Sequence, residues 1–144
     1  MRKILIINGP NINMLGIREP IIYGNQNYQT LISNINAWAN ELGCEVECFQ
    51  SNHEGDIVDR IQQAYSDGTY GIVINPAAYT HTSVAILDAL KAVGLPAVEI
   101  HISDINEREA FRHISYAGLA CEEHYIGLGF EGYKKGMEYL VNRD

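Results

Sequence analysis

The sequence has few basic residues and no long apolar run. Its 10 lysines and arginines stand against 18 aspartates and glutamates, for a net charge of −8 at pH 7. This balance argues against nucleic acid or an anionic membrane as a partner, because both require clustered positive charge. No apolar run approaches the ~20 residues that span a bilayer. The start, Met1-Arg2-Lys3, is typical of a signal peptide, but the apolar run after it stops at Asn8. We therefore expect a cytoplasmic protein, in which a few local arginines would still suffice for a small anionic substrate.

Cysteine is also scarce, and the three cysteines fit neither a disulfide nor a zinc pattern. Cys44 and Cys48 fall on one predicted strand, Cys121 stands alone, and no C-x-x-C occurs. Reduced thiols are the simpler interpretation.

What the chain does contain is an alternation of apolar strands and amphipathic helices. Its 144 residues suit a single domain, 1–144. The patterns predict strands at 3–8, 44–50, 70–75, 97–101 and 125–128, and helices at 28–42, 54–65, 82–93 and 130–141. A further helical turn or more is expected at 108–113. The alternation predicts an α/β fold, a flavodoxin-like three-layer sandwich whose five-stranded parallel sheet has the order 2-1-3-4-5.

Polar residues crowd the ends of three predicted strands, at 8–11, 75–83 and 99–103. In this strand order the first and third strands are neighbours, and ligands bind beyond the carboxyl ends of such strands. A polar group at a buried strand end needs a partner or a function. We therefore expect an active site at these three segments.

Glu99 and His101 are two residues apart on one strand, so their side chains face the same side. A carboxylate beside an imidazole fixes the ring's tautomer and favours its protonated form. His101 is therefore a candidate general acid. The alternative, a buried pair that only satisfies itself, is about equally supported by the residues alone.

Other candidates are weaker when taken singly. His81 falls at the start of a predicted helix, where backbone N–H groups bind anions, although an exposed histidine in a capping segment fits as well. The backbone of Ile102 and Ser103 offers similar donors to a carboxylate. Arg108 and Arg112 are predicted to lie one helical turn apart on one face, ready to hold a hydroxyl or carboxylate, unless they pair with neighbouring glutamates.

The long loop 11–27 contains Arg18 and Tyr23. A guanidinium near a phenol favours phenolate and lowers the tyrosine pKa from its usual ~10. With glycines near both ends, the loop could act as a lid that assembles a base when substrate binds. An ordinary surface loop is the competing interpretation.

Two other functions are suggested by specific motifs. Residues 127–132 match the dinucleotide pattern G-x-G-x-x-G and favour a flavin or nucleotide binder. Too few residues follow for another strand, and no acidic residue stands ~20 positions later, so tight packing of strand and helix explains the glycines better. A metal-dependent hydrolase would instead use His81, Glu99 and His101.

Taken together, the motifs resemble those of the type II 3-dehydroquinate dehydratases (type II dehydroquinases). The matching segments are Asn8-Gly-Pro-Asn11, Arg18-Glu-Pro with Tyr23-Gly24, Asn75-Pro76, Thr80-His-Thr-Ser83, Glu99-Ile-His101-Ile-Ser103, Arg108-Glu-Ala-Phe-Arg112, Gly127-Leu-Gly129 and Gly132-Tyr133. The ordered set covers nearly the whole chain and is far more specific than any one motif.

The resemblance implies a lyase of the shikimate pathway, in aromatic amino acid biosynthesis, that works without a cofactor or a metal. It would remove water from 3-dehydroquinate by anti elimination, through an enolate, to give 3-dehydroshikimate. By position, Tyr23 would be the base and Arg18 would lower its pKa. Asn11 would support the enolate, and His101, oriented by Glu99, would protonate the departing hydroxyl.

The remaining implied roles concern binding and assembly. The substrate carboxylate would be held by Asn75 and the backbone of Ile102 and Ser103, and the ring oxygens by His81 and Arg112. Asp88 matches a position that members of this family lend to a neighbouring subunit. The resemblance therefore also implies a homo-oligomer, trimers packed into a dodecamer.

The chain departs from the family pattern at three places. Ala77 stands where glycine is expected in many members, and Ile114 where a second histidine is frequent. The segment 122–125 is unusually polar for the approach to the last strand, and we expect it to affect subunit contacts. None of these positions is a proposed catalytic residue.

Overall fold

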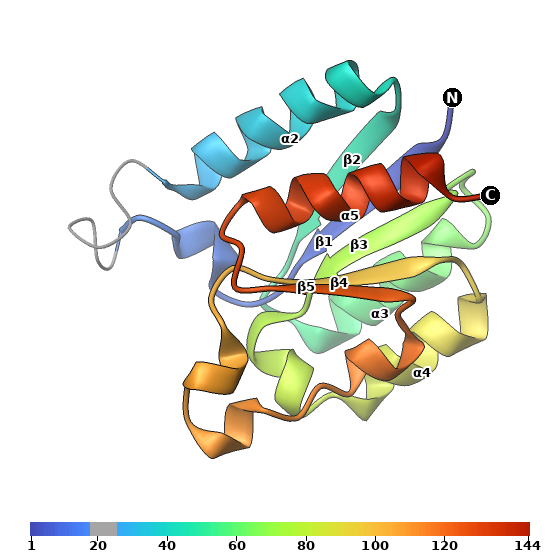
Figure 1. Cartoon of the computed structure of the whole chain (residues 1–144). Helices are drawn as coiled ribbons and strands as arrows, with labels where there is room; N and C mark the ends of the chain where they lie inside the picture. The colour runs from blue at the N-terminus through green and yellow to red at the C-terminus, as the bar shows by residue number, and fades with distance from the viewer. Residues whose placement is uncertain (18–25) are drawn as a thin grey trace.

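A twisted parallel sheet forms the centre of the computed structural model, which describes residues 1–17 and 26–144 (Figure 1). The strand order is β2-β1-β3-β4-β5. The strands are β1 (Lys3–Asn8), β2 (Glu45–Gln50), β3 (Gly71–Asn75), β4 (Ala97–His101) and β5 (Glu123–Ile126). All four neighbouring pairs are parallel. The predicted fold class and strand order are confirmed.

Two helices cover each face of the sheet (Figure 1). Side chains of α2 (Tyr28–Leu42) and α5 (Glu131–Asn142) form one apolar cluster, and those of α3 (Glu54–Ala64) and α4 (Val84–Val93) form the other. Strand β1 lies between the two: Ile4 and Ile6 join the first cluster, while Leu5 and Ile7 join the second. A strand buried on both faces reads as a continuous apolar run, which is why residues 3–8 show no alternation.

The helix ends follow ordinary capping rules. The Asn27 side chain accepts a hydrogen bond from the Thr30 backbone N–H at 2.8 Å and begins α2. Ser83 does the same for α4 by accepting from the Ile86 N–H at 2.9 Å. The predicted helix 82–93 therefore starts two residues later than expected, because the preceding residues form the short 3-10 helix η2 (Ala77–His81).

Two predicted strands are shifted in the structure. The last strand is β5 at 123–126 rather than 125–128, because the Gly127 N–H bonds to the His101 carbonyl at 2.9 Å and the chain turns there. The second strand begins after Cys44, whose N–H is still bonded to the Ala39 carbonyl of α2.

The segment that follows β4 is built from short 3-10 turns: η3 (Ile105–Glu107), η4 (Ala110–Arg112) and η5 (Ala117–Ala120). Arg108 lies between the first two with extended backbone, at φ −101° and ψ −168°. The prediction that Arg108 and Arg112 share one helical face is therefore wrong. A similar turn, η1 (Ile12–Met14), follows β1.

Close packing explains the glycines at 127–132 only in part. A Cβ atom on Gly132 would make ordinary van der Waals contact, at 3.4 Å from Ile100 Cγ2 and 3.7 Å from Tyr125 Cβ, whereas Gly127 and Gly129 have positive φ, at +79° and +61°, which favours glycine. None of the helices in the described part of the chain is long and apolar enough to cross a membrane.

Candidate active site

The carboxyl ends of β1, β3 and β4 lie side by side and bring the predicted segments together. Asn8 and Asn75 are direct register partners, and β4 pairs with β3 on its other side. The Asn75 side chain is held from within the protein. Its Nδ2 donates to the Tyr133 hydroxyl at 2.9 Å, and its Oδ1 accepts from the Ala77 N–H at 3.1 Å. The Tyr133 hydroxyl in turn donates to Asn8 Oδ1 at 2.6 Å. One of the two amide hydrogens of Asn75 is left for a ligand.

Glu99 and His101 form the buried pair that their spacing predicts. His101 Nε2 donates to Glu99 Oε2 at 2.7 Å, and the two side chains are 5% and 2% exposed. The carboxylate therefore fixes the tautomer of the ring. The other ring nitrogen, Nδ1, makes no hydrogen bond to the described residues and can face a substrate.

Glu99 has two further partners that the sequence did not reveal. The Ser115 hydroxyl donates to Oε2, and His124 Nδ1, on the neighbouring strand, donates to Oε1 at 2.7 Å. Burial alone would raise the pKa of Glu99, but the hydrogen bonds from His101, Ser115 and His124 outweigh it and hold the pKa at about 2. The carboxylate is therefore charged at neutral pH, although it lies inside the protein.

Gly118 allows the turn η5 to close over this carboxylate. A Cβ atom at this position would lie only 2.7 Å from Glu99 Oε1 and 2.8 Å from the Ser115 hydroxyl oxygen. The Ser115 hydroxyl also accepts a hydrogen bond from the Gly118 N–H at 3.0 Å. Serine and glycine together shape the wall of the Glu99 site.

His81 and the chain after β4 provide candidate contacts for an anionic ligand. His81 Nδ1 donates to the Ile114 carbonyl at 2.8 Å, which leaves Nε2 as the ring nitrogen for a ligand. The backbone N–H groups of Ile102 and Ser103 donate no hydrogen bond to the described residues. Their roles in binding a carboxylate and ring oxygens stay predictions.

Arg112 and Asn11 are less tightly enclosed. Arg112 Nε donates to Glu109 Oε2 at 2.6 Å, so the competing interpretation of a pair with a neighbouring glutamate is correct for this contact. Its two terminal nitrogens remain for a ligand. Asn11 is exposed and adopts a left-handed backbone at φ +69°, with its N–H bonded to Asn52 Oδ1 at 3.0 Å.

Among the described residues, one further predicted site residue lies apart from this group. Asp88 is exposed on α4 and has no hydrogen bond or ion pair with the described residues. Arg18 and Tyr23 lie outside the described residues, so their predicted roles stay predictions.

Ala77, the first residue of η2, explains one departure from the family pattern. Its φ is +54°, in the left-handed region that favours glycine. Because its N–H bonds to Asn75 Oδ1, this strained residue also helps to hold the asparagine amide.

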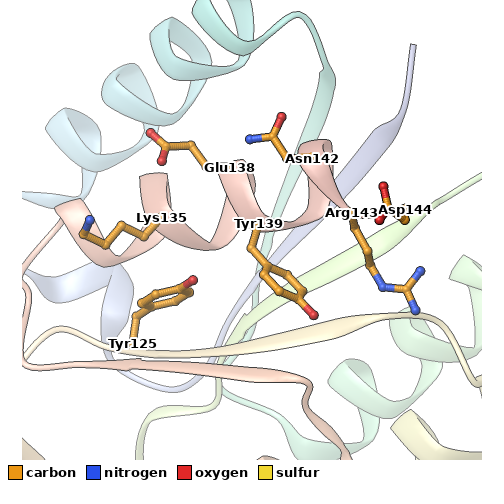
Figure 2. A pocket seen from close by; sticks show the side chains of 7 residues that line it. All are labelled: Tyr125, Lys135, Glu138, Tyr139, Asn142, Arg143 and Asp144. Carbon is orange, nitrogen blue, oxygen red and sulfur yellow. The ribbon is translucent and has the colours of Figure 1, made fainter.

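The described residues contain a groove away from the strand ends. It has a volume of about 500 Å³ and lies along α5 and β5 (Figure 2). Its walls are formed by Tyr125, Lys135, Glu138, Tyr139, Asn142, Arg143 and Asp144, none of which is a predicted site residue. Within residues 1–17 and 26–144, no group of three or more His, Cys, Asp or Glu residues is placed to hold a metal ion.

Comparisons with known proteins point to one family. The family model described as dehydroquinase class II matches residues 2–141. A 3-dehydroquinate dehydratase of Lachnospira eligens is 55% identical over 141 residues, which cover 97% of this chain and 96% of that protein. The crystal structure of a type II dehydroquinase from Butyrivibrio crossotus superposes with a TM-score of 0.93 at 55% identity, over 96% of this chain and 97% of that one. A type II dehydroquinase from Propionibacterium acnes has a TM-score of 0.89 at 37% identity, over 98% of both chains.

Proposed function

Because this chain belongs to the class II dehydroquinase family, we propose that it is a lyase that removes water from 3-dehydroquinate in the shikimate pathway. The observation that carries the proposal is the buried Glu99–His101 pair at the carboxyl end of β4. An elimination needs an acid for the departing hydroxyl, and this pair supplies one with its tautomer already fixed.

The acid step follows from the geometry of the pair. In its protonated state His101 gives the Nδ1 proton to the hydroxyl oxygen as the carbon–oxygen bond breaks, and the ring then keeps its Nε2 hydrogen on Glu99. The charged Glu99 stabilises the imidazolium before transfer. Because the ring is buried, water does not compete for this proton.

The base and the group that stabilises the enolate come from the segment that follows β1. Tyr23 removes the proton beside the ketone as a phenolate, and Arg18 stabilises that phenolate. An enolate forms, and Asn11 donates toward its oxygen. The base then works on one side of the substrate ring and His101 on the other, which gives anti elimination.

The groups around His101 bind the substrate. The free amide hydrogen of Asn75 and the backbone N–H groups of Ile102 and Ser103 bind the substrate carboxylate. His81 Nε2 and the terminal nitrogens of Arg112 bind the ring hydroxyls. These donors make no other hydrogen bond to the described residues, which supports their assignment.

We also propose the homo-oligomer that the family resemblance implies, trimers assembled as a dodecamer, with Asp88 offered to a neighbouring subunit. Its exposed position without a partner on α4 is consistent with that role. The cytoplasm stays the expected compartment. Light scattering of the purified protein tests the assembly, and a stable 16.1 kDa monomer would refute it.

The activity is tested by mixing the protein with 3-dehydroquinate and following the ultraviolet absorbance of the conjugated enone product. We expect a steady rise that is unaffected by a chelator, whereas a metal-dependent hydrolase would lose activity. No turnover by well-folded protein would end the proposal.

The base is tested by Tyr23→Phe. This variant should lose turnover while it still binds an unreactive substrate analogue, because only the phenolic oxygen is removed. If the variant keeps its turnover, another residue is the base.

A further inference from the structure

Glu99 is bound by a second histidine from the adjacent strand. His124 of β5 is the direct register partner of Glu99 on β4, so both side chains lie on the same face of the sheet. His124 Nδ1 donates to Glu99 Oε1 at 2.7 Å, while His101 and Ser115 both bind Oε2. The carboxylate is thus held between two imidazoles.

We propose that His124 is a positioning residue that locks the Glu99 carboxylate and thereby fixes the ring of the acid His101. The inference rests on the proposed function, since it requires His101 to be the acid. It adds a residue that lies at no position in the motifs matched to the family.

The distribution of hydrogen bonds explains why this contact is needed. Among the described side chains, His124 is the only one that bonds to Oε1. Without it, a buried and charged carboxylate oxygen would lose its hydrogen-bond partner, which is unfavourable. The carboxylate would also be free to rotate about its last carbon–carbon bond and carry Oε2 away from His101.

The other ionisable groups around the carboxylate do not compete for this role. Burial raises the pKa of the Cys121 thiol to about 12, with help from the charges of Glu99 and Glu122, so the thiol is neutral. Glu122 is bound by Arg143 at 2.7 and 2.9 Å and by Tyr139 at 2.8 Å. Glu123 alternates to the opposite face of β5, beside Tyr125.

The two imidazoles differ in their access to solvent. The His101 side chain is 5% exposed and the His124 side chain 43%. His101 is therefore enclosed for proton transfer to a substrate, whereas His124 supports Glu99 from the rim. By donating to Oε1, His124 also takes up part of the negative charge that Glu99 otherwise directs at His101.

The test compares His124→Val, His124→Asn and His124→Gln in the 3-dehydroquinate assay. The asparagine amide nitrogen can occupy the place of His124 Nδ1, whereas the glutamine amide extends beyond it. We expect kcat to fall about tenfold to a hundredfold in the valine and glutamine variants, as for other partners of a catalytic group. KM should change by less than about twofold, and asparagine should restore most of kcat.

The pH profile supplies a readout that a purely structural role would not move. In His124→Val, the full charge of Glu99 acts on His101, which then keeps its proton to higher pH. We expect the alkaline limb of kcat to shift upward by about half a pH unit to one unit, with a smaller shift in His124→Asn. The proposal would be overturned if all variants had the kcat and the alkaline pH limb of the wild type. It would also be overturned if kcat fell as far in the asparagine variant as in the glutamine variant.

A measurement without turnover separates this inference from the proposed function. We expect the ¹⁵N signals of the His101 ring to move in His124→Gln and to stay near the wild-type values in His124→Asn, whatever reaction the protein catalyses. Unchanged signals in the glutamine variant would refute the contact between the two histidines through Glu99. Absence of wild-type turnover would refute only the proposed function. If the valine variant does not fold, the asparagine and glutamine variants still test the proposal, both by kinetics and by the ¹⁵N signals.

Discussion

Two carboxylates at opposite ends of the sheet reach the same ionisation state by different means. Asp67, which precedes β3 at the amino end, lies 3.0 Å from Arg60 and 3.5 Å from Lys3, and accepts hydrogen bonds from the Thr69 hydroxyl and N–H at 2.6 and 3.0 Å. Burial alone would raise its pKa, but these partners hold it at about 2, the same value as for Glu99.

The partners of the two carboxylates differ in what they can do. Asp67 is held by the cationic side chains of Arg60 and Lys3 and by Thr69, which keep the carboxylate in place. Arg60, buried on α3, also pairs with Glu47 of β2 and ties the helix to the sheet edge. Glu99 is bound by a serine hydroxyl and two imidazoles, and an imidazole is the side chain that most often acts as a general acid or base. A low carboxylate pKa therefore does not by itself identify a catalytic site, and our proposal for Glu99 rests on the nature of its partners.

The largest effect should come from replacing His101, the proposed acid. His101→Asn removes the proton donor but keeps a polar side chain, so kcat should fall by about 10²–10⁴-fold with the fold intact. Kinetics in the enone assay and circular dichroism measure the two properties. Activity within a factor of about three of the wild type would show that the pair is structural, like the Asp67 cluster.

Glu99→Gln should lower both activity and stability. The pKa of Glu99 is depressed from 4.5 to about 2, so its ionisation contributes on the order of 3 kcal/mol above pH 4.5. That contribution is lost as the pH falls from 4.5 toward 2. Urea unfolding of the variant should therefore give a lower free energy at pH 7 and a weaker pH dependence in this window. An unchanged pH dependence would contradict the assignment.

Asp67→Asn is the matched control at the other end of the sheet. It should lower the free energy of unfolding by roughly 1–2 kcal/mol, because Arg60 loses a charged partner. As in Glu99→Gln, the free energy of unfolding should also depend less on pH below neutral. Its kcat should stay within about twofold of the wild type. A large loss of kcat would mean that the two ends of the sheet are coupled.

The smallest effects should come from backbone strain. Ala77 at the carboxyl end and Gly68 at the amino end have positive φ, at +54° and +88°. Ala77→Gly should gain up to about 1 kcal/mol, since relief of left-handed strain exceeds the added entropy of the unfolded chain. Gly68→Ala should lose about 1 kcal/mol. Thermal unfolding of both variants tests the two predictions. A loss of stability in Ala77→Gly would contradict the claim that the backbone of Ala77 is strained.

Much of the fold could be predicted because three of the strands, β1, β3 and β4, are buried on both faces. The run at 4–7 is apolar throughout and is followed by asparagine and glycine, so the sequence predicts both the strand and the point where it ends. The contact between Glu99 and His101 could also be predicted, because their two-residue spacing places both side chains on the same side of one strand.

What could not be predicted depends on contacts between elements. The pairing of His124 with Glu99 requires the register of β4 and β5, and β5 is a short edge strand whose polar residues obscure its bounds. The separation of Arg108 from Arg112 arises from two 3-10 turns, which leave little periodicity in the sequence. The left-handed backbone at Ala77 could not be predicted from the residue itself, because alanine disfavours a positive φ. The only signal is that many members of the family are expected to have glycine at this position.

The central claim is that 3-dehydroquinate is bound and dehydrated at the carboxyl ends of β1, β3 and β4. A crystal structure with an unreactive analogue of 3-dehydroquinate tests it most directly. We expect the analogue's carboxylate at Asn75 and the Ile102–Ser103 backbone, and its leaving oxygen, or the equivalent atom, within hydrogen-bond distance of His101 Nδ1. An analogue bound in the groove along α5 and β5, with the strand ends empty, would contradict the account.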